Sequence, residues 1–167
     1  MQRRTLLKFG LAGLFMAGGV GWLGRQFAKV EVIAGQSVVT DAHRPMLKAL
    51  ASAILDGAAQ PDQLDRAVNQ FIVASQGLAP EAQAELGQLL NILTNPVGRR
   101  LIASLDQDWA NTSPGQAAHF LQEFRRHPVP ALQPGYHALH DLMFGAWYAE
   151  PDTWQAMGYE GPPFKLA

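Results

Sequence analysis

Prolines and glycines divide the chain between residues 40 and 150 into segments of helical length, and this punctuation restricts the fold more than any other feature. Within each segment, apolar residues recur at the spacing of one helical face, and a proline opens most segments as a first-turn proline does. No segment in this region alternates apolar and polar residues over strand length. We expect helices over residues 41–57, 61–77, 80–95, 96–109, 114–127 and 134–148.

These segments predict an all-α fold, a small irregular bundle of about six helices of about 12 to 16 residues joined by tight turns. A signal helix is expected to precede the bundle and an extended tail rich in aromatic residues and proline to follow it. The expected organisation is a signal segment at 1–34, a helical domain at 35–150 and a docking tail at 151–167. The helical domain is long enough for one modest core.

Composition narrows the classes of function. From Gly35 onward the chain carries eight Lys or Arg and thirteen Asp or Glu, so this part has a net charge of −5. A mildly acidic body lacks the basic stripe that nucleic-acid binding requires, and no nucleic-acid partner is expected. The chain contains no cysteine, which excludes cysteine-ligated iron–sulfur clusters, covalently attached c-type haem and a thiol nucleophile in this chain.

The N-terminus carries a motif of its own. Arg3 and Arg4, followed by Leu6, Leu7 and Lys8, resemble the twin-arginine export signal, and a glycine-rich apolar run follows from Phe9 to Leu23. The run is shorter than the roughly 20 apolar residues of a membrane-spanning helix. The resemblance implies recognition by the twin-arginine translocase and a periplasmic location. Association with the inner membrane is expected through a partner complex or through a signal that is not cleaved.

Side chains able to support chemistry are few. His137, His140 and Asp141 share one helical face at i, i+3 and i+4, a spacing that can contribute to a metal site. No second cluster supplies the remaining ligands, and we expect structural or solvated roles for all three. The pairs Arg99-Arg100 and Arg125-Arg126 are interpreted as solvated helix faces. No catalytic, cofactor-binding or metal-binding residue is assigned to this chain.

After Glu150 the sequence becomes rich in aromatic residues, glycine and proline. The prolines at 162 and 163 cannot continue a helix, and such a pre-stiffened segment loses little entropy when it docks on a partner. A tail that packs back on its own bundle is an equal alternative. Because aromatic side chains dominate interface energies, we predict that the partner-binding residues are Trp147, Tyr148, Trp154, Tyr159, Pro162 and Pro163.

The layout as a whole resembles a known family. The signal, the overall length and about the last 25 residues, including Leu142–Tyr148 and the ending Gly158-Tyr159-Glu160-Gly161-Pro162-Pro163, are similar to the small accessory subunit of membrane-associated, FAD-dependent alcohol and sugar dehydrogenases. Gluconate 2-dehydrogenase subunit 3 and the small subunit of sorbitol dehydrogenase are related examples. The resemblance implies an all-helical, non-catalytic subunit that escorts, matures and stabilises a large catalytic subunit through twin-arginine export.

In that family the large subunit, of the glucose-methanol-choline type, holds FAD and oxidises the substrate, and a multihaem cytochrome c subunit often accepts the electrons. We therefore expect FAD in the partner and no cofactor in this chain. Two other classes stay open. One is a stand-alone periplasmic helical ligand-binding protein, which needs an apolar pocket between helices. The other is a small metal- or haem-dependent enzyme, which needs His137, His140 and Asp141 to converge with a further ligand.

Overall fold

The computed structural model describes residues 37–154 and 158–160 of the 167-residue chain. Within these ranges the chain forms α-helices and short 3-10 turns and no strand, which confirms the all-α prediction. The six α-helices are α3 (Arg44–Ile54), α4 (Leu64–Gln76), α5 (Pro80–Thr94), α6 (Pro96–Ala103), α7 (Pro114–Arg125) and α8 (Gln133–Tyr148). The 3-10 turns are η1 (Asp41–His43), η2 (Pro61–Gln63), η3 (Trp109–Asn111), η4 (Pro130–Leu132) and η5 (Pro151–Thr153).

The helix starts follow local chemistry. Pro80, Pro96 and Pro114 each occupy the first helical position, where the missing N–H costs nothing because it has no intrahelical acceptor. Ser113 and Gln116 form a capping box: the Ser113 hydroxyl accepts from the Gln116 N–H, and the Gln116 side chain accepts from the Ser113 N–H. Because these contacts join residues only three positions apart, the start of α7 can be predicted from the sequence.

The fourth helix is shorter than expected. The pattern predicted a helix from Pro96 to Trp109, but α6 ends at Ala103 because Ser104 adopts a left-handed conformation with φ 51°. The chain then turns back, which buries Leu105 and brings Trp109 into the core, where its indole N–H donates to the Leu93 carbonyl at 2.8 Å. Tertiary burial of these two side chains, rather than a proline or glycine, therefore ends the helix.

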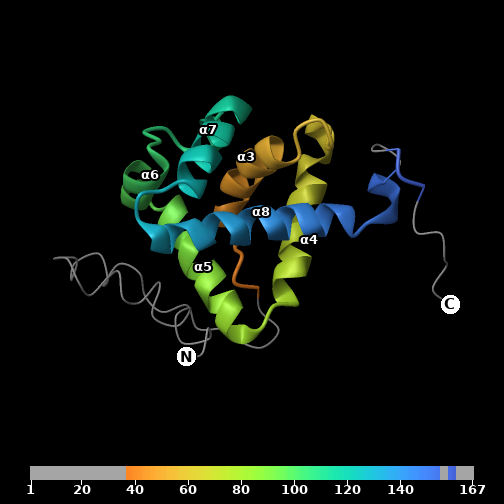
Figure 1. Ribbon diagram of the computed structural model, residues 1–167, viewed down its shortest axis with the longest axis horizontal. Helices are drawn as coiled ribbons and strands as arrows, with labels where there is room; N and C mark the ends of the chain where they lie inside the picture. Colours follow the sequence, from red (N-terminus) through yellow and green to blue (C-terminus); the bar gives the residue numbers. More distant parts are fainter. Residues whose placement is uncertain (1–36, 155–157, 161–167) are drawn as a thin grey trace.

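The bundle is organised around α8, which crosses α4 and lies near α5 at its other end (Figure 1). Helix α8 also packs on α7, and α3 packs against both α4 and α7. Phe120 stacks on Phe124 with ring centroids 5.1 Å apart and meets the edge of Trp109 at 5.4 Å. No helix among the described residues is both long and apolar enough to span a membrane.

A buried histidine links the N-terminal turn to α5. His43 is 2% exposed; its Nδ1 accepts from the Thr40 N–H at 3.1 Å, and its Nε2 donates to Asn91 Oδ1 at 2.9 Å. Nδ1 acts as an acceptor only in the neutral ring. Burial lowers the pKa of His43 below 6.5, and the hydrogen bond with Asn91 offsets part of that effect. The folded state therefore favours neutral imidazole.

This burial makes stability depend on pH. Because the folded-state pKa of His43 lies below its value in the unfolded chain, the unfolded state takes up more protons as the pH falls through 6.5. We expect the free energy of unfolding to be independent of His43 above about pH 7.5 and to decrease below it until the folded-state pKa is passed. Urea unfolding of wild type and His43→Gln at several pH values measures the effect. Parallel stability curves for the two proteins would contradict it.

Candidate docking surface on helix α8

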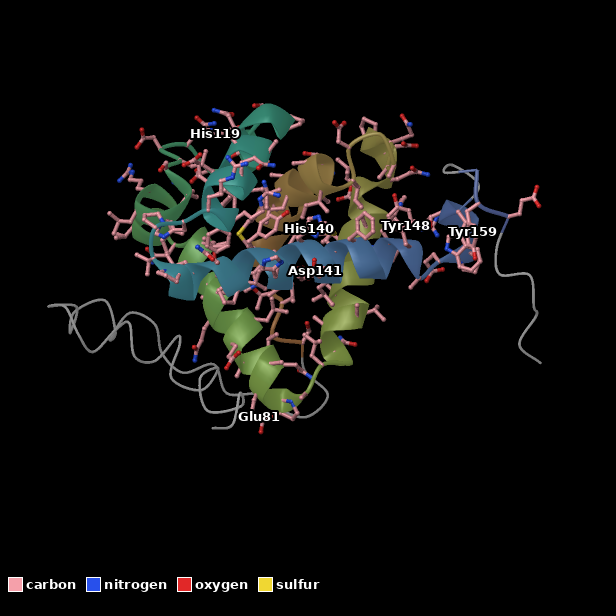
Figure 2. The ribbon with its side chains drawn as sticks, in the orientation of Figure 1. Glu81, His119, His140, Asp141, Tyr148 and Tyr159 are labelled. Atoms are coloured by element: carbon pink, nitrogen blue, oxygen red, sulfur yellow. The ribbon has the colours of Figure 1, made fainter. Side chains whose placement is uncertain are left out.

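Four aromatic side chains form a continuous stripe along α8, here called the α8 aromatic stripe: Tyr136, His140, Phe144 and Tyr148. They lie at successive i, i+4 positions, where side chains on one helix face meet. The ring centroids of neighbours lie 5.3, 5.7 and 4.5 Å apart along the stripe. Figure 2 labels His140 and Tyr148 on this helix. The stripe is a surface feature, because Phe144 is 44% exposed and the other three are half-buried.

The stripe leads directly into the start of the C-terminal tail. The Trp154 indole N–H donates to the Tyr148 carbonyl at 2.8 Å, and the Trp154 ring lies 5.4 Å from that of Tyr159. Gly158, with φ +71°, allows the chain to reverse before Tyr159. Tyr159 is 47% exposed, and Figure 2 shows it beyond the C-terminal end of α8. Two further aromatic side chains therefore follow directly beyond the end of the helix.

The first turn of the tail is attached to the bundle. Thr153 is buried, and its hydroxyl donates to the carbonyls of Trp147 and Glu150 at 3.1 and 2.7 Å. Asp152 pairs with Arg66 of α4 at 2.7 Å, and the Arg66 hydrogen bond lowers the pKa of the Asp152 carboxyl. Of the two alternatives for the tail, packing back on the bundle therefore holds for residues 151–154. These contacts fix the direction in which the chain leaves α8.

The structure separates the predicted partner-binding residues into three groups. Trp147 is 2% exposed and belongs to the core, so it presents no surface to a partner, and the prediction for this residue is corrected. Tyr148 and Trp154 are half-buried, whereas Tyr159 is exposed. Pro162 and Pro163 lie outside the described residues, as do the signal residues Arg3, Arg4, Leu6, Leu7 and Lys8.

Sequence reasoning missed three members of the α8 aromatic stripe, namely Tyr136, His140 and Phe144. The sequence pattern that indicates the stripe is an aromatic residue at every fourth position from 136 to 148. It was obscured because the same helix also carries Leu139, Met143 and Trp147, whose burial defines the core face. The two faces share one apolar pattern, and only packing shows which of them is covered.

Within the described part of the chain, His137, His140 and Asp141 lie together on α8 without a ligand from another element. Asp141 Oδ1 lies 2.9 Å from His140 Nδ1, and Asp141 Oδ2 lies 3.9 Å from His137 Nδ1. All three side chains belong to α8. Among the described residues, no group of three or more His, Asp or Glu side chains is arranged to hold a metal ion. The i, i+3 and i+4 spacing places these groups on one helix surface, and no side chain from another described element completes a coordination shell.

One arginine differs from the expectation. Arg99 was interpreted as solvated, but it is 6% exposed and pairs with Asp108, while Arg100 next to it is exposed. The Arg99 guanidinium also donates to the Asp106 carbonyl at 3.5 Å. This side chain therefore holds the loop that follows α6, which is a structural role. Arg125 and Arg126 are exposed, as predicted.

A groove between α5 and α8, here called the α5–α8 groove, is the second surface able to receive another molecule. Its volume is about 500 Å³, within the range of ligand-sized sites. Its floor is apolar, and its polar lining consists of the carboxylates Glu85 and Asp141 and the imidazole of His137. The apolar lining consists of Leu78, Ala82, Leu86, Leu89, Pro134, Gly135, Ala138 and Leu142.

The α8 aromatic stripe and the α5–α8 groove adjoin on α8, because His140 of the stripe contacts Asp141 of the groove at 2.9 Å. The α8 aromatic stripe, extended by Trp154 and Tyr159, is rich in rings and contains no Lys, Arg, Asp or Glu. The α5–α8 groove combines an apolar floor with acidic groups. No protein-family model, no curated protein and no solved structure matches this chain.

Proposed function

We propose that this chain is the non-catalytic small subunit of a periplasmic FAD-dependent alcohol or sugar dehydrogenase. In this role it escorts the catalytic subunit through twin-arginine export and stabilises it afterwards. The dehydrogenase large subunit is the partner and carries the FAD, with a multihaem cytochrome c subunit as a further component of the complex. The proposal combines the resemblance of the two chain ends with the aromatic surface of the folded domain.

The observation that carries the proposal is that Trp154 and Tyr159 follow directly beyond the end of the α8 aromatic stripe, with the Trp154 indole hydrogen-bonded to the Tyr148 carbonyl. The tail residues that carry the family resemblance begin where the stripe ends, and the Arg66–Asp152 pair and the buried Thr153 hold that junction. Aromatic rings supply large contact areas at low entropic cost, and they dominate binding energy in protein interfaces. Rings exposed along a rigid helix are therefore well suited to dock on a large partner.

The test is co-purification of the C-terminally tagged chain from its native host, with flavin absorbance and mass spectrometry as readouts. We expect a stoichiometric flavoprotein with wild type. The double variant Phe144→Glu/Tyr159→Glu should lose at least about thirty-fold of the partner affinity, the equivalent of one interface hot spot of about 2 kcal/mol. Neither side chain is buried, so the variant is expected to fold.

Leu101→Glu is the matched control, because Leu101 is an exposed apolar residue, 66% exposed, on α6. It should leave the amount of flavoprotein unchanged. Equal recovery with the double variant, or no flavoprotein with wild type, would refute the proposal. Removal of residues 151–167 is a weaker test, because it also removes the buried Thr153. Truncation after Trp154 leaves those contacts in place.

The export half of the proposal has its own test. Changing Arg3 and Arg4 to Lys removes the bidentate guanidinium groups and keeps both positive charges. We expect the chain and its flavoprotein partner to accumulate together in the cytoplasm. Cell fractionation with immunoblotting measures both proteins. A partner that still reaches the periplasm in this variant would contradict the escort role while leaving complex formation intact.

A further inference from the structure

The α5–α8 groove lacks an occupant among the described residues, and its chemistry restricts what it can bind. The floor is formed by leucine and alanine side chains from α5, α8 and the turn before α5. Glu85 and Asp141 supply negative charge on both sides, one from each helix. Asp141 lies 2.9 Å from His140 and 3.9 Å from His137, which also lines the groove, whereas Glu85 forms no ion pair within the described part of the chain. A fitting occupant is an apolar segment with basic residues close to it.

The N-terminal part of this chain has that composition. Residues 9–23 are an apolar run, and residues 1–36 carry five basic side chains, Arg3, Arg4, Lys8, Arg25 and Lys29, against a single acidic one, Glu31. The remainder of the chain has a net charge of −5. The charges of the segment and of the groove are therefore opposite, and the apolar parts match. No other stretch outside the described residues combines a long apolar run with several basic residues.

The linker between the N-terminal segment and the folded domain is long enough for the segment to reach the α5–α8 groove. The described chain begins at Ser37, and Val38 and Val39 are buried in the core close to η1, which packs against α5. The seven residues between Lys29 and Ser37 span up to about 25 Å when extended. A domain of this size has a radius of gyration of only about 13 Å. The apolar run can therefore reach the groove, and the linkage keeps its effective concentration near the millimolar range.

We propose that residues 9–29 of this chain dock in the α5–α8 groove of its own folded domain, with Arg25 and Lys29 facing Glu85 and Asp141. The docked segment covers the apolar floor and withholds the apolar run of the export signal from the translocase until a competing surface displaces it. The fold thus contains an autoinhibitory contact on the signal. The inference rests on the export half of the proposed function and is independent of the identity of a dehydrogenase partner.

The absence of cysteine makes a direct test available. Ala138→Cys introduces a single thiol at an exposed position lining the groove, and Gly145→Cys introduces one at an exposed position on the same helix away from it. In the purified full chain, with its intact mass verified, we expect a maleimide reagent to label Cys at 138 about tenfold more slowly than Cys at 145. That ratio corresponds to a tethered segment at about 1 mM that binds with a dissociation constant of about 0.1 mM.

Two further changes identify the occupant. Leu11→Glu/Phe15→Glu in the signal should raise the labelling rate at position 138 to that at position 145. Glu85→Lys should do the same, whereas Glu81→Lys, one turn earlier on α5 and outside the lining, should leave the protection unchanged (Figure 2 labels Glu81). Equal labelling at 138 and 145 in the starting protein would overturn the proposal. Protection that survives the signal substitutions, or that depends on protein concentration, would assign the groove to another ligand or to a second copy and would equally overturn it.

Discussion

Trp147→Ala is expected to lower the free energy of unfolding by about 3–5 kcal/mol, the usual cost of truncating a fully buried large aromatic side chain. Trp147 is among the largest side chains of the core and is 2% exposed. Its ring is covered by the Arg66 guanidinium at 5.7 Å, and its carbonyl accepts from Thr153. Loss of the ring therefore leaves a cavity at the junction of α4, α8 and η5.

Urea or thermal unfolding of the purified variants measures this effect. Phe144→Ala is the matched control on the same helix, because Phe144 is already 44% exposed and its removal leaves no cavity. We expect Phe144→Ala to change stability by less than about 1 kcal/mol. Equal losses for the two variants would show that Trp147 is not part of the core. A loss of partner binding in Trp147→Ala would report unfolding and would not mark an interface residue.

Gly98→Ala is expected to destabilise the fold by about 3 kcal/mol, at the upper end of the usual cost of overpacking. A Cβ at this position would lie 2.0 Å from the Ile92 carbonyl oxygen and 2.9 Å from its carbon. Both atoms belong to the backbone of α5 and cannot move aside by a change of rotamer. Alanine at position 98 therefore forces α6 away from α5, and with it the loop held by Arg99.

Gly145→Ala is the control, because it is expected to raise the free energy of unfolding where Gly98→Ala lowers it. Gly145 lies inside α8, and a Cβ there would meet no atom within 4 Å. Replacing a helix-interior glycine with alanine removes an entropic cost of about 0.5–1 kcal/mol. Denaturant unfolding should thus rank the proteins with Gly145→Ala above wild type and Gly98→Ala well below it. A stable Gly98→Ala variant would contradict the close approach of α5 and α6.

The division of the chain into helices could be predicted from the sequence because its causes are local. Pro80, Pro96 and Ser113-Pro114 start their helices through backbone geometry and capping, which involve residues only a few positions apart. The end of α6 could not be predicted, because it depends on the burial of Leu105 and Trp109 against residues of other helices. The burial of Arg99 could not be predicted for the same reason, because its partner Asp108 becomes its neighbour only through the turn at Ser104.

For the candidate surfaces, the sequence by itself determined the residue types: aromatic residues along α8 and in the tail, an apolar and basic N-terminal segment, and an acidic body. Only the tertiary structure decided that Trp147 is covered while Phe144 is exposed, although both lie on one apolar helix. It also decided that α5 and α8 enclose a groove with Glu85 and Asp141 on its two sides. The physical reason is that helical periodicity specifies which residues share a face, whereas the exposure of that face depends on the elements that pack against it.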